Sequence, residues 1–336
     1  MKLKHLFAAV LVISLATLTA GCAERKPQKI RIAMVVKNLG NGFFDAAHQG
    51  AKEAANQLGD VDIIYTGPTT PNAEGQIEII NSLISQKVDA IVISANDPNA
   101  IVPIAKKAMQ RGIKVLSFDS GLAPEGRLMQ LNPSNAGLIG LKQLQMASDA
   151  IGGAGEIAIL SASAQATNQN IWIGVMKDEL AKRPEFAQLK LVSTVYGDDQ
   201  SDKSYREAVG LLRSNPNLKV IISPSTVGIN AAAKAVVDEH LVGKVYVTGL
   251  GLPSEMAGHV QSGAVKEFAI WNPIDLGYAV TYAAYAFVKE NPSAKPGGTL
   301  ELGRMGPVVI DANGEAALAP PFVYHKENVV KFSKIF

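Results

Sequence analysis

The sequence has 336 residues, of which 47% are hydrophobic and 18% charged, a composition typical of folded globular proteins rather than of disordered chains. Its 32 basic residues nearly match its 30 acidic ones, and the two numbers become equal when Lys2 and Lys4 of the N-terminal segment are set aside. The chain therefore lacks the basic excess that attracts nucleic acid, and we exclude DNA and RNA as partners. At about 100–200 residues per domain, the length accommodates two domains.

The N-terminal segment has the order of an export signal. Two lysines precede the apolar run Leu6–Ala20, which is shorter than the roughly 20 apolar residues that cross a bilayer but fits a secretory signal. The small residues before Cys22, the only cysteine of the sequence, resemble a lipoprotein cleavage site. We expect residues 1–21 to be a lipoprotein signal peptide, Cys22 to carry the lipid and residues 22–29 to be a polar tether. The alternative is an ordinary cleaved signal with an incidental cysteine.

From residue 30 onward, short runs rich in β-branched residues alternate with segments of helical periodicity. The runs are apolar throughout, as is typical of parallel strands covered on both faces. In chain order, we predict a strand at 30–36, a helix at 45–58, a strand at 61–65, a helix at 72–86, a strand at 90–94, a helix at 100–111 and a strand at 114–118. This order indicates a doubly wound α/β unit.

The same alternation resumes after Pro133. We predict strands at 156–160, 189–196, 220–223, 245–249 and 265–270, and helices at about 170–181, 201–214, 229–239 and 253–261. A further apolar helix at 272–289 follows the last of these strands, and its position indicates that the chain returns there to the first unit. The sequence therefore predicts an α/β fold of two doubly wound parallel-sheet lobes, without a tandem sequence repeat.

In such sheets, ligands bind beyond the carboxyl ends of the strands. The loops at these positions are rich in Asn, Asp, Ser, Thr and Gly rather than in Lys and Arg. They are residues 37–44, 66–70, 95–98, 119–123, 161–169, 197–202, 224–228 and 249–253. Their composition favours a ligand that is polar and uncharged.

Motifs for nucleotides, metals and catalysis are missing from these loops. No Walker loop occurs, and Gly40-Asn-Gly42 is followed by Phe-Phe-Asp instead of a dinucleotide-binding pattern. The five histidines are scattered, and neither a zinc motif nor a nucleophile elbow is present. Asp198, Asp199 and Asp202 crowd one loop but lack the spacing of a calcium-binding loop, so we interpret them as a solvated turn and helix cap. We expect no cofactor, no metal and no enzymatic activity. An exported carbohydrate-active enzyme, which needs a carboxylate pair, is the catalytic alternative.

Aromatic and amide side chains remain at the strand ends. Trp and Phe faces match the C–H faces of sugars, Asp accepts from two neighbouring hydroxyls, and Asn or Gln donates and accepts at once. Taken singly, each has a structural alternative, because Asp119 could cap a turn and Phe43 could belong to the core. Together they favour a polyol pocket between two lobes. The candidates are Phe43, Phe44, Asp119, Asn168, Gln169, Trp172, Trp271 and Asn272.

The segments KNLGNGFFDAAHQGAKEAA, DAIVISANDPNA, AMQRGIKVLSFDS and VKEFAIWNP resemble the periplasmic sugar-binding proteins of ABC importers, of the type I, ribose-binding-like class. The resemblance implies two lobes joined by three crossovers, a sugar in the cleft, a membrane-embedded ABC permease as partner, and a monomer. It places the crossovers near residues 132–134, 271–273 and 304–309. The N-terminal lobe would then comprise residues 30–132 and 272–305, and the C-terminal lobe residues 133–271 and 306–336.

Within this family the sequence most resembles the rhamnose-binding branch, through SANDPNA, ILSASAQATNQNIWI, YGDDQSDKSYREA, IISPSTVGINAAA and VTGLGLPSEM. A sister branch binds autoinducer-2, but it carries Asp-Gln where this chain has Asn168-Gln169. It also carries Pro-x-Ala where this chain has Pro224-Ser-Thr226. Ribose is disfavoured because Asp119 is followed by Ser-Gly rather than by Arg.

The resemblance implies a lipid-anchored sugar receptor, and we expect L-rhamnose or a related deoxy sugar as its ligand. The sugar's methyl group would contribute about 0.8 kcal/mol on burial, so its hydroxyl pattern would dominate specificity. We expect ligand contacts from Lys37, Asn38, Phe43, Phe44, Asp97, Asp119, Asn168, Gln169, Trp172, Pro224, Thr226, Trp271 and Asn272. The alternatives are an autoinducer-2 receptor and a sugar sensor that signals to a membrane kinase or chemoreceptor. A transcription repressor of the same fold is excluded, because the export signal occupies the place of its DNA-binding helices.

Overall fold

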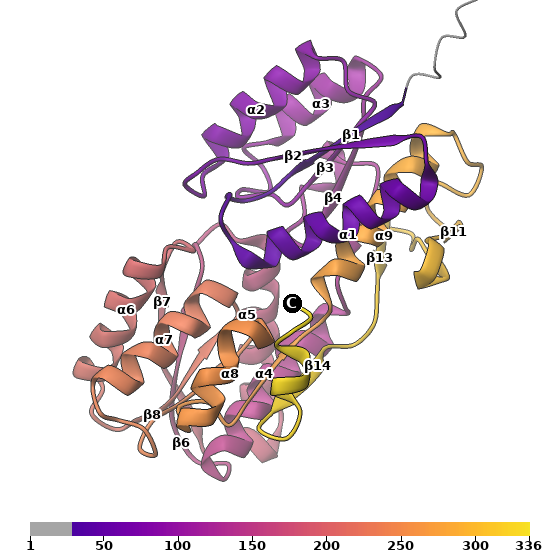
Figure 1. Ribbon diagram of the computed structural model, residues 1–336. Helices are drawn as coiled ribbons and strands as arrows, with labels where there is room; N and C mark the ends of the chain where they lie inside the picture. The colour runs from indigo at the N-terminus through magenta and orange to yellow at the C-terminus, as the bar shows by residue number, and fades with distance from the viewer. Residues whose placement is uncertain (1–28) are drawn as a thin grey trace, which may run out of the picture.

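The computed structural model describes residues 29–336. The predicted signal peptide, the lipid attachment at Cys22 and nearly all of the tether lie outside the described residues. The described chain forms two lobes, which Figure 1 shows one above the other. Each lobe contains a parallel sheet covered by helices, so the predicted fold of two doubly wound α/β lobes is confirmed.

The first lobe is built on a six-stranded sheet. Its strands are β1 (Ile30–Val35), β2 (Val61–Thr66), β3 (Ala90–Ile93), β4 (Lys114–Phe118), β5 (Gln130–Asn132) and β13 (Glu315–Ala317). They lie in the order β13-β5-β4-β3-β1-β2, and neighbouring strands are parallel. Helices α1 (Gly42–Leu58) and α9 (Pro273–Val288) cover one face, and α2 (Ala73–Ser85) and α3 (Val102–Gln110) cover the other (Figure 1). Alternate buried residues of β1 serve the two faces: Met34 belongs to the core with α1, and Val35 to the core with α2 and α3.

The second lobe is built on four parallel strands in the order β7-β6-β8-β9. These strands are β6 (Gly155–Ser161), β7 (Leu189–Tyr196), β8 (Leu218–Ser223) and β9 (Tyr246–Gly249). A bridge between Leu250 and Ala269 adds β10 (Glu267–Ile270) beside β9, and β14 (Phe322–His325) pairs with β10 in the antiparallel sense. The helices of this lobe are α4 (Ala136–Ile151), α5 (Thr167–Lys182), α6 (Ser201–Ser214), α7 (Thr226–Asp238), α8 (Pro253–Ser262) and α10 (Val329–Phe332). A hairpin of β11 (Thr299–Glu301) and β12 (Pro307–Val309) and short 3₁₀ turns at Pro124–Gly126, Pro184–Phe186 and Gly303–Met305 complete the described chain.

The chain passes between the lobes after β5, after β10 and between β13 and β14. The first passage lies between Asn132 and Ala136, and the second between Ile270 and Pro273. The third does not lie near residues 304–309, because β13 still pairs with β5 in the first sheet and Leu318 N–H donates to Asn132 O at 3.1 Å. The passage therefore lies at residues 319–321, and the boundary predicted at 305/306 was wrong. A three-residue strand without β-branched residues leaves no pattern in the sequence, because its pairing depends on the exposed edge of β5.

Helices α1, α5 and α7 each begin three residues before their predicted starts, and helices α4 and α10 were not predicted. Helix α4 was missed, since Gly137 and Gly140 lower its helix propensity. Gly140 is required there by packing, because a Cβ on it would lie 2.8 Å from the carbonyl oxygen of Trp172 on α5. Helix α1 begins at Gly42 rather than at residue 45, because the side chain of Asn41 accepts from Phe43 N–H at 3.0 Å and caps it.

Helices α1 and α9 pack closely enough to exclude side chains at two positions. A Cβ on Gly50 of α1 would lie 1.8 Å from the carbonyl oxygen of Ile274, and a Cβ on Gly277 of α9 would lie 1.8 Å from that of Ala47. These distances are far below van der Waals contact, so both positions require glycine. The contact holds residues 47–50 of α1 against the first turns of α9, on the side of the first lobe that faces the second (Figure 1).

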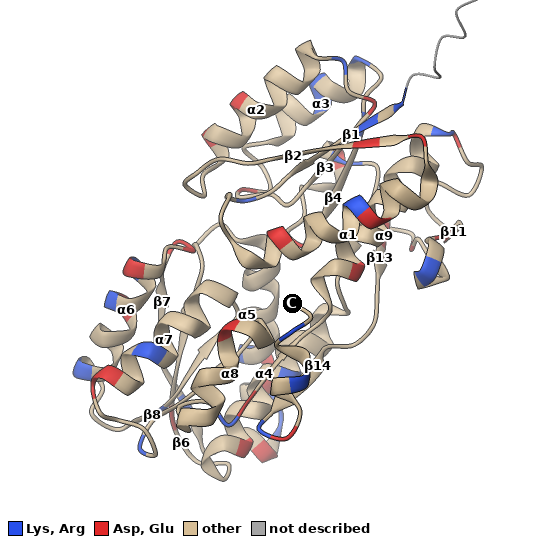
Figure 2. Cartoon of the chain, viewed as in Figure 1, with Lys and Arg blue, Asp and Glu red and all other residues tan. Residues whose placement is uncertain are grey.

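Charged side chains of both signs are interspersed over the two lobes. In the view of Figure 2, residues of both signs occur on each lobe, and neither sign forms a continuous face. None of the helices within residues 29–336 is long and apolar enough to cross a membrane.

Candidate functional site

A cavity lies between the two lobes, at the carboxyl ends of both sheets. The space between its walls, including the part that is open to solvent, is about 390 Å³. The first lobe contributes residues that follow β1 and β4 and the first turn of α1, and the second lobe contributes residues that follow β6, β7, β8, β9 and β10. The lining residues are Lys37, Asn41, Phe43, Phe44, Asp119, Asn168, Gln169, Trp172, Asp199, Pro224, Ser225, Thr226, Leu250, Ile270 and Trp271.

A hydrogen-bond bridge joins the lobes across this cavity. The carboxylate of Asp119, from the first lobe, accepts from the side-chain amide of Asn168 of the second lobe at 2.9 Å. The amide oxygen of Asn168 in turn accepts from Lys37 Nζ at 3.5 Å. The other carboxylate oxygen of Asp119 accepts from the Ser94 hydroxyl at 2.8 Å. These groups are buried, so each bond that they make is shielded from competing water.

Asp119 lies in an unusual backbone conformation and a desolvated environment. Its φ of 55° is in the left-handed region that residues other than Gly, Asn and Asp rarely adopt. Burial raises the pKa of its carboxyl, while the Lys37 ammonium and the hydrogen bonds from Ser94 and Asn168 oppose this rise. Strain and desolvation of this kind persist where the surrounding structure enforces them, and they are concentrated at functional sites.

Gln169 presents one half of its amide to the cavity. Its oxygen accepts from the Ser161 hydroxyl at 2.7 Å and from Ala162 N–H at 2.8 Å, and both donors lie at the end of β6. Among the described residues, no hydrogen bond uses the amide nitrogen. The side chain is thus held in place through its oxygen and can donate to a ligand through its nitrogen.

Aromatic rings form one continuous wall of the cavity. The Phe43 and Trp271 ring centroids lie 6.1 Å apart and those of Trp172 and Trp271 5.8 Å apart, both edge to face. Phe44 is edge to face with Phe43 at 5.2 Å and with Phe118 of β4 at 6.5 Å. The indole nitrogen of Trp271 is buried and has no partner among the described residues. The wall therefore presents apolar aromatic surface to the cavity.

The two neighbouring phenylalanines are expected to respond differently to truncation. Phe44 packs on Phe118 in the core of the first lobe, whereas Phe43 packs on Trp271 at the cavity. Phe44→Ala is expected to lower the free energy of unfolding by about 3 kcal/mol or more. Phe43→Ala is expected to weaken ligand binding about tenfold, with a smaller loss of stability. Thermal unfolding and calorimetry on the two variants test this ranking, and the reverse order would contradict it.

Ten of the thirteen residues expected from the sequence line the cavity, and three do not. Asp97 is a turn residue whose carboxylate accepts from the N–H groups of Asn99 and Ala100 at 2.8 Å. Asn272 caps α9 by accepting from Ile274 N–H at 3.0 Å. Asn38 is buried beside Lys37, and its amide oxygen has no partner among the described residues.

Sequence reasoning missed five lining residues, which are Asn41, Asp199, Ser225, Leu250 and Ile270. Ile270 is the last residue of β10, where Trp271 after it was the candidate instead, and Leu250 directly follows β9 but is apolar. Asp199 was interpreted as part of a solvated turn, although it follows the carboxyl end of β7, where ligand-binding residues are expected. Its position directly after a strand could have identified Asp199 as a ligand-binding candidate. The neighbouring aspartates instead led to the interpretation as a solvated turn.

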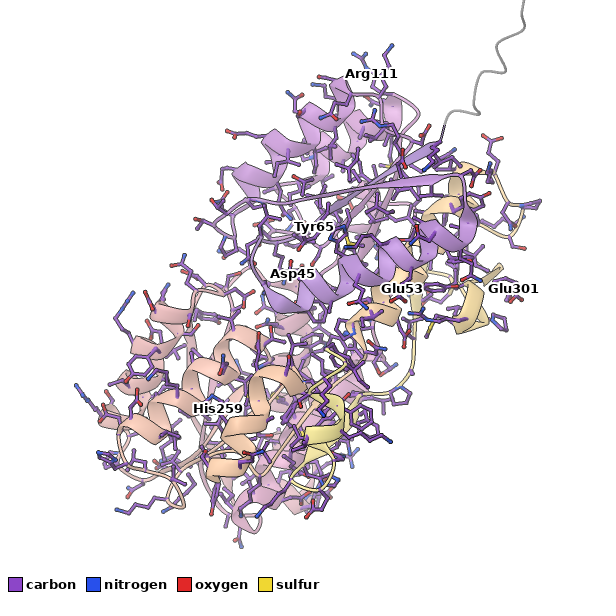
Figure 3. The ribbon with its side chains drawn as sticks, in the orientation of Figure 1. Asp45, Glu53, Tyr65, Arg111, His259 and Glu301 are labelled. Carbon is purple, nitrogen blue, oxygen red and sulfur yellow. The ribbon has the colours of Figure 1, made fainter. Side chains whose placement is uncertain are left out.

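The histidines of residues 29–336 are absent from the cavity lining. His48 stacks on Tyr65 at 4.2 Å, and Tyr65 donates to Asp45 at 2.9 Å on the first lobe (Figure 3). His259 contacts the side chain of Asn230 at 2.8 Å on the second lobe. No group of three or more His, Cys, Asp or Glu residues within residues 29–336 is placed to hold a metal ion. The cavity is thus equipped to bind polar groups and contains no histidine.

Comparison with known proteins identifies relatives over most of the chain. A model of the periplasmic binding protein domain family matches residues 32–292. The chain is 29% identical to a D-ribose/D-allose-binding protein of Pseudomonas aeruginosa over 263 residues, which are 73% of this chain and 79% of the relative.

Solved structures extend the similarity to the whole fold. An ABC transporter solute-binding protein from Clostridium phytofermentas with bound L-rhamnose has a TM-score of 0.88 and 34% identity, covering 92% of this chain and 99% of that one. LsrB from Clostridium saccharobutylicum in complex with AI-2 has a TM-score of 0.86 at 21% identity, covering 90% of this chain and 99% of that one. At this lower identity, the likeness to LsrB concerns the fold alone.

Proposed function

The chain belongs to the periplasmic binding protein domain family, among the sugar-binding proteins of ABC transporters, and from this premise we propose that it binds L-rhamnose or a related deoxy sugar and delivers it to a permease. Members of this family are transport proteins rather than enzymes. The proposal concerns the identity of the sugar and the role of the cavity between the lobes.

One observation carries the proposal: the cavity combines a polar bridge with an aromatic wall. Asp119, Asn168 and Lys37 supply acceptors and donors for a set of hydroxyls. The rings of Phe43 and Trp271 supply an apolar surface for a methyl group. A buried methyl contributes about 0.8 kcal/mol, which is less than a factor of ten in affinity. The arrangement of hydroxyls would therefore decide which deoxy sugar binds most tightly. The solute-binding protein of similar fold that holds L-rhamnose supports this choice of sugar.

The contacts between the lobes support binding by closure. Besides the bridge through Asn168, the Thr167 hydroxyl donates to Gly121 O at 3.2 Å across the gap. Gly42, at the start of α1, lies against the second lobe, and a Cβ on it would be 3.0 Å from Glu255 Oε1. Hinge motion about the three crossovers would open the cavity, and closure on the sugar would present a surface of both lobes to the permease.

Calorimetry with purified protein and a panel of ligands tests the proposal. The panel contains L-rhamnose, L-fucose, D-ribose, D-allose and autoinducer-2. We expect micromolar or tighter binding of L-rhamnose or another deoxy sugar and weaker binding of the others. Tight binding of autoinducer-2 without binding of any deoxy sugar would overturn it. Retention of sugar uptake in a deletion strain that loses a transcriptional response would favour a sensor, and turnover of a sugar by the pure protein would reveal an enzyme.

We also propose that the exported chain is held at the membrane through a lipid on Cys22. Cys22→Ser is expected to move the protein from the membrane fraction to the soluble fraction of cells, because the acyl chains provide the anchorage. Fractionation of cells that express each form measures this change. An unchanged membrane fraction would contradict the lipid anchor and leave the sugar-binding proposal intact.

A further inference from the structure

Asp199 is the one carboxylate in the cavity to which neither the bridge nor the aromatic wall gives a role. It lies in the loop between β7 and α6 of the second lobe, opposite Asp119 of the first. Asp198 and Asp199 both have left-handed backbones, with φ of 52° and 48°. The side chains of these two consecutive residues have different surroundings. Asp198 forms an ion pair with Lys203, whereas Asp199 lines the cavity.

A second-lobe hydroxyl fixes the orientation of Asp199. Its Oδ1 accepts from Ser225 Oγ at 2.5 Å. Ser225 is the N-cap of α7, and its Oγ accepts from Gly228 N–H at 3.1 Å. The single proton of this hydroxyl is thereby committed to Asp199. Among the described residues, no hydrogen bond uses Oδ2 of Asp199. The carboxylate is thus held by one oxygen and offers the other.

The charges in the cavity indicate what this oxygen binds. Lys37 is the one cation among the lining residues, which include two carboxylates, Asp119 and Asp199. The charge of Asp199 adds to burial in raising the pKa of Asp119, so the two carboxylates interact across the cavity. Two facing carboxylates repel an anionic ligand and are stabilised by hydroxyl groups that donate to them.

We infer that Asp199 binds the ligand, its Oδ2 accepting a hydrogen bond from a sugar hydroxyl, so that one carboxylate from each lobe holds the sugar. The inference rests on the proposed function, since it assumes that the cavity receives an uncharged sugar. It assigns Asp199 to specificity as well, because a uronate or a sugar phosphate would bring a like charge between the two carboxylates.

The test compares Asp199→Asn with Asp198→Asn by calorimetry with L-rhamnose. The two changes are matched, because both residues lie in the same loop, both have left-handed backbones and asparagine tolerates that conformation. We expect Asp199→Asn to weaken binding about 10- to 100-fold, because a charge-assisted hydrogen bond is lost. Asp198→Asn is expected to bind within about threefold of the original protein, since its partner Lys203 lies outside the cavity lining.

Deoxy analogues separate a contact with the sugar from an effect on the loop. The 1,5-anhydro derivative and the 2-, 3- and 4-deoxy analogues of L-rhamnose each lack one of its four hydroxyls. The analogue without the hydroxyl bound by Asp199 should bind the original protein weakly, and Asp199→Asn should weaken it little further. If the variant weakens all analogues and L-rhamnose equally, Asp199 acts on the loop and the inference is overturned. Asp199→Gly, which also keeps the left-handed backbone, replaces Asp199→Asn if the latter does not fold.

The outcomes distinguish this inference from the proposed function. If the original protein binds L-rhamnose and Asp199→Asn binds it equally well, the inference fails and the proposed function stands. If the original protein binds a different uncharged sugar of the panel, the same comparison is made with that sugar and its deoxy analogues. If it binds no uncharged sugar, the proposed function fails, and the inference fails with it.

Discussion

Asp119→Asn is expected to abolish most of the affinity for the sugar while leaving the fold intact. Its carboxylate is the first-lobe end of the bridge to Asn168 and is buried next to Lys37. Removing one buried charged partner costs about 2–4 kcal/mol, which corresponds to a loss of roughly 30- to 1,000-fold in affinity. Asparagine has the same shape and tolerates the φ of 55°, so the loss reports on charge rather than on misfolding.

Asp97→Asn is the matched control for this change. Asp97 also follows a strand of the first lobe, but its carboxylate accepts from the backbone N–H groups of Asn99 and Ala100 and does not line the cavity. Its replacement should leave affinity within about twofold, because asparagine also caps such turns. Calorimetry measures both affinities, and thermal unfolding checks that both variants fold. Equal affinities for Asp119→Asn and the original protein would contradict the assigned role of Asp119.

The same carboxylate predicts how affinity and stability depend on pH. Burial raises the pKa of Asp119 above its ordinary value of about 3.9. Affinity should fall as pH falls through the raised pKa, because a protonated carboxyl loses a charged acceptor. The stability of the sugar-free protein should change in the opposite sense. Asp119 adds to the free energy of unfolding, and this addition is fully present below about pH 3.9. It is lost as pH rises through the raised pKa, because the charged carboxylate is desolvated only in the folded state. Asp119→Asn should lack both effects, and titrations of the two proteins measured side by side isolate them.

Gly50→Ala and Gly277→Ala are expected to cause the largest losses of stability. A Cβ at either position would lie 1.8 Å from a backbone carbonyl oxygen of the facing helix, and a backbone atom cannot move aside as a flexible side chain can. Forcing α1 and α9 apart should cost about 3 kcal/mol or more and lower the melting temperature by roughly 6–12 °C. Phe43 lies in the first turn of α1, so each variant should also bind the sugar more weakly.

Gly174→Ala and Gly258→Ala are the controls for the helix pair. Both glycines lie inside helices, and a Cβ on either would meet no atom within 4 Å. Alanine should leave the melting temperature unchanged or raise it, since it is favoured over glycine in a helix by up to about 1 kcal/mol. Thermal unfolding of the four variants measures the contrast. A melting temperature for Gly50→Ala equal to that of Gly174→Ala would contradict the close packing of α1 and α9.

The regular elements were largely predictable because their signals are local. Strand β4 and helix α6 were placed at the ends that the structure has, since apolar runs and helical periodicity lie within the segments themselves. Helix α4 was missed because Gly140, which lowers its helix propensity, serves the contact with α5, and that contact is absent from the local pattern. Strand β13 was assigned to the wrong lobe because its partner, β5, lies far away in the sequence.

The sequence alone determined the α/β class, the two lobes and the loops that meet at the cavity, because strand ends and turn residues are read from neighbouring positions. Only the tertiary structure decided which side chains meet. Lys37 and Asn168 are 131 positions apart, and Asn168 and Asp119 are 49 apart. Asp199 acquired its place through Ser225, 26 positions away, and through backbone angles that its sequence neighbours do not reveal. Such residues, distant in the sequence, meet at the cavity because of how the two sheets face each other. No local sequence pattern encodes that arrangement.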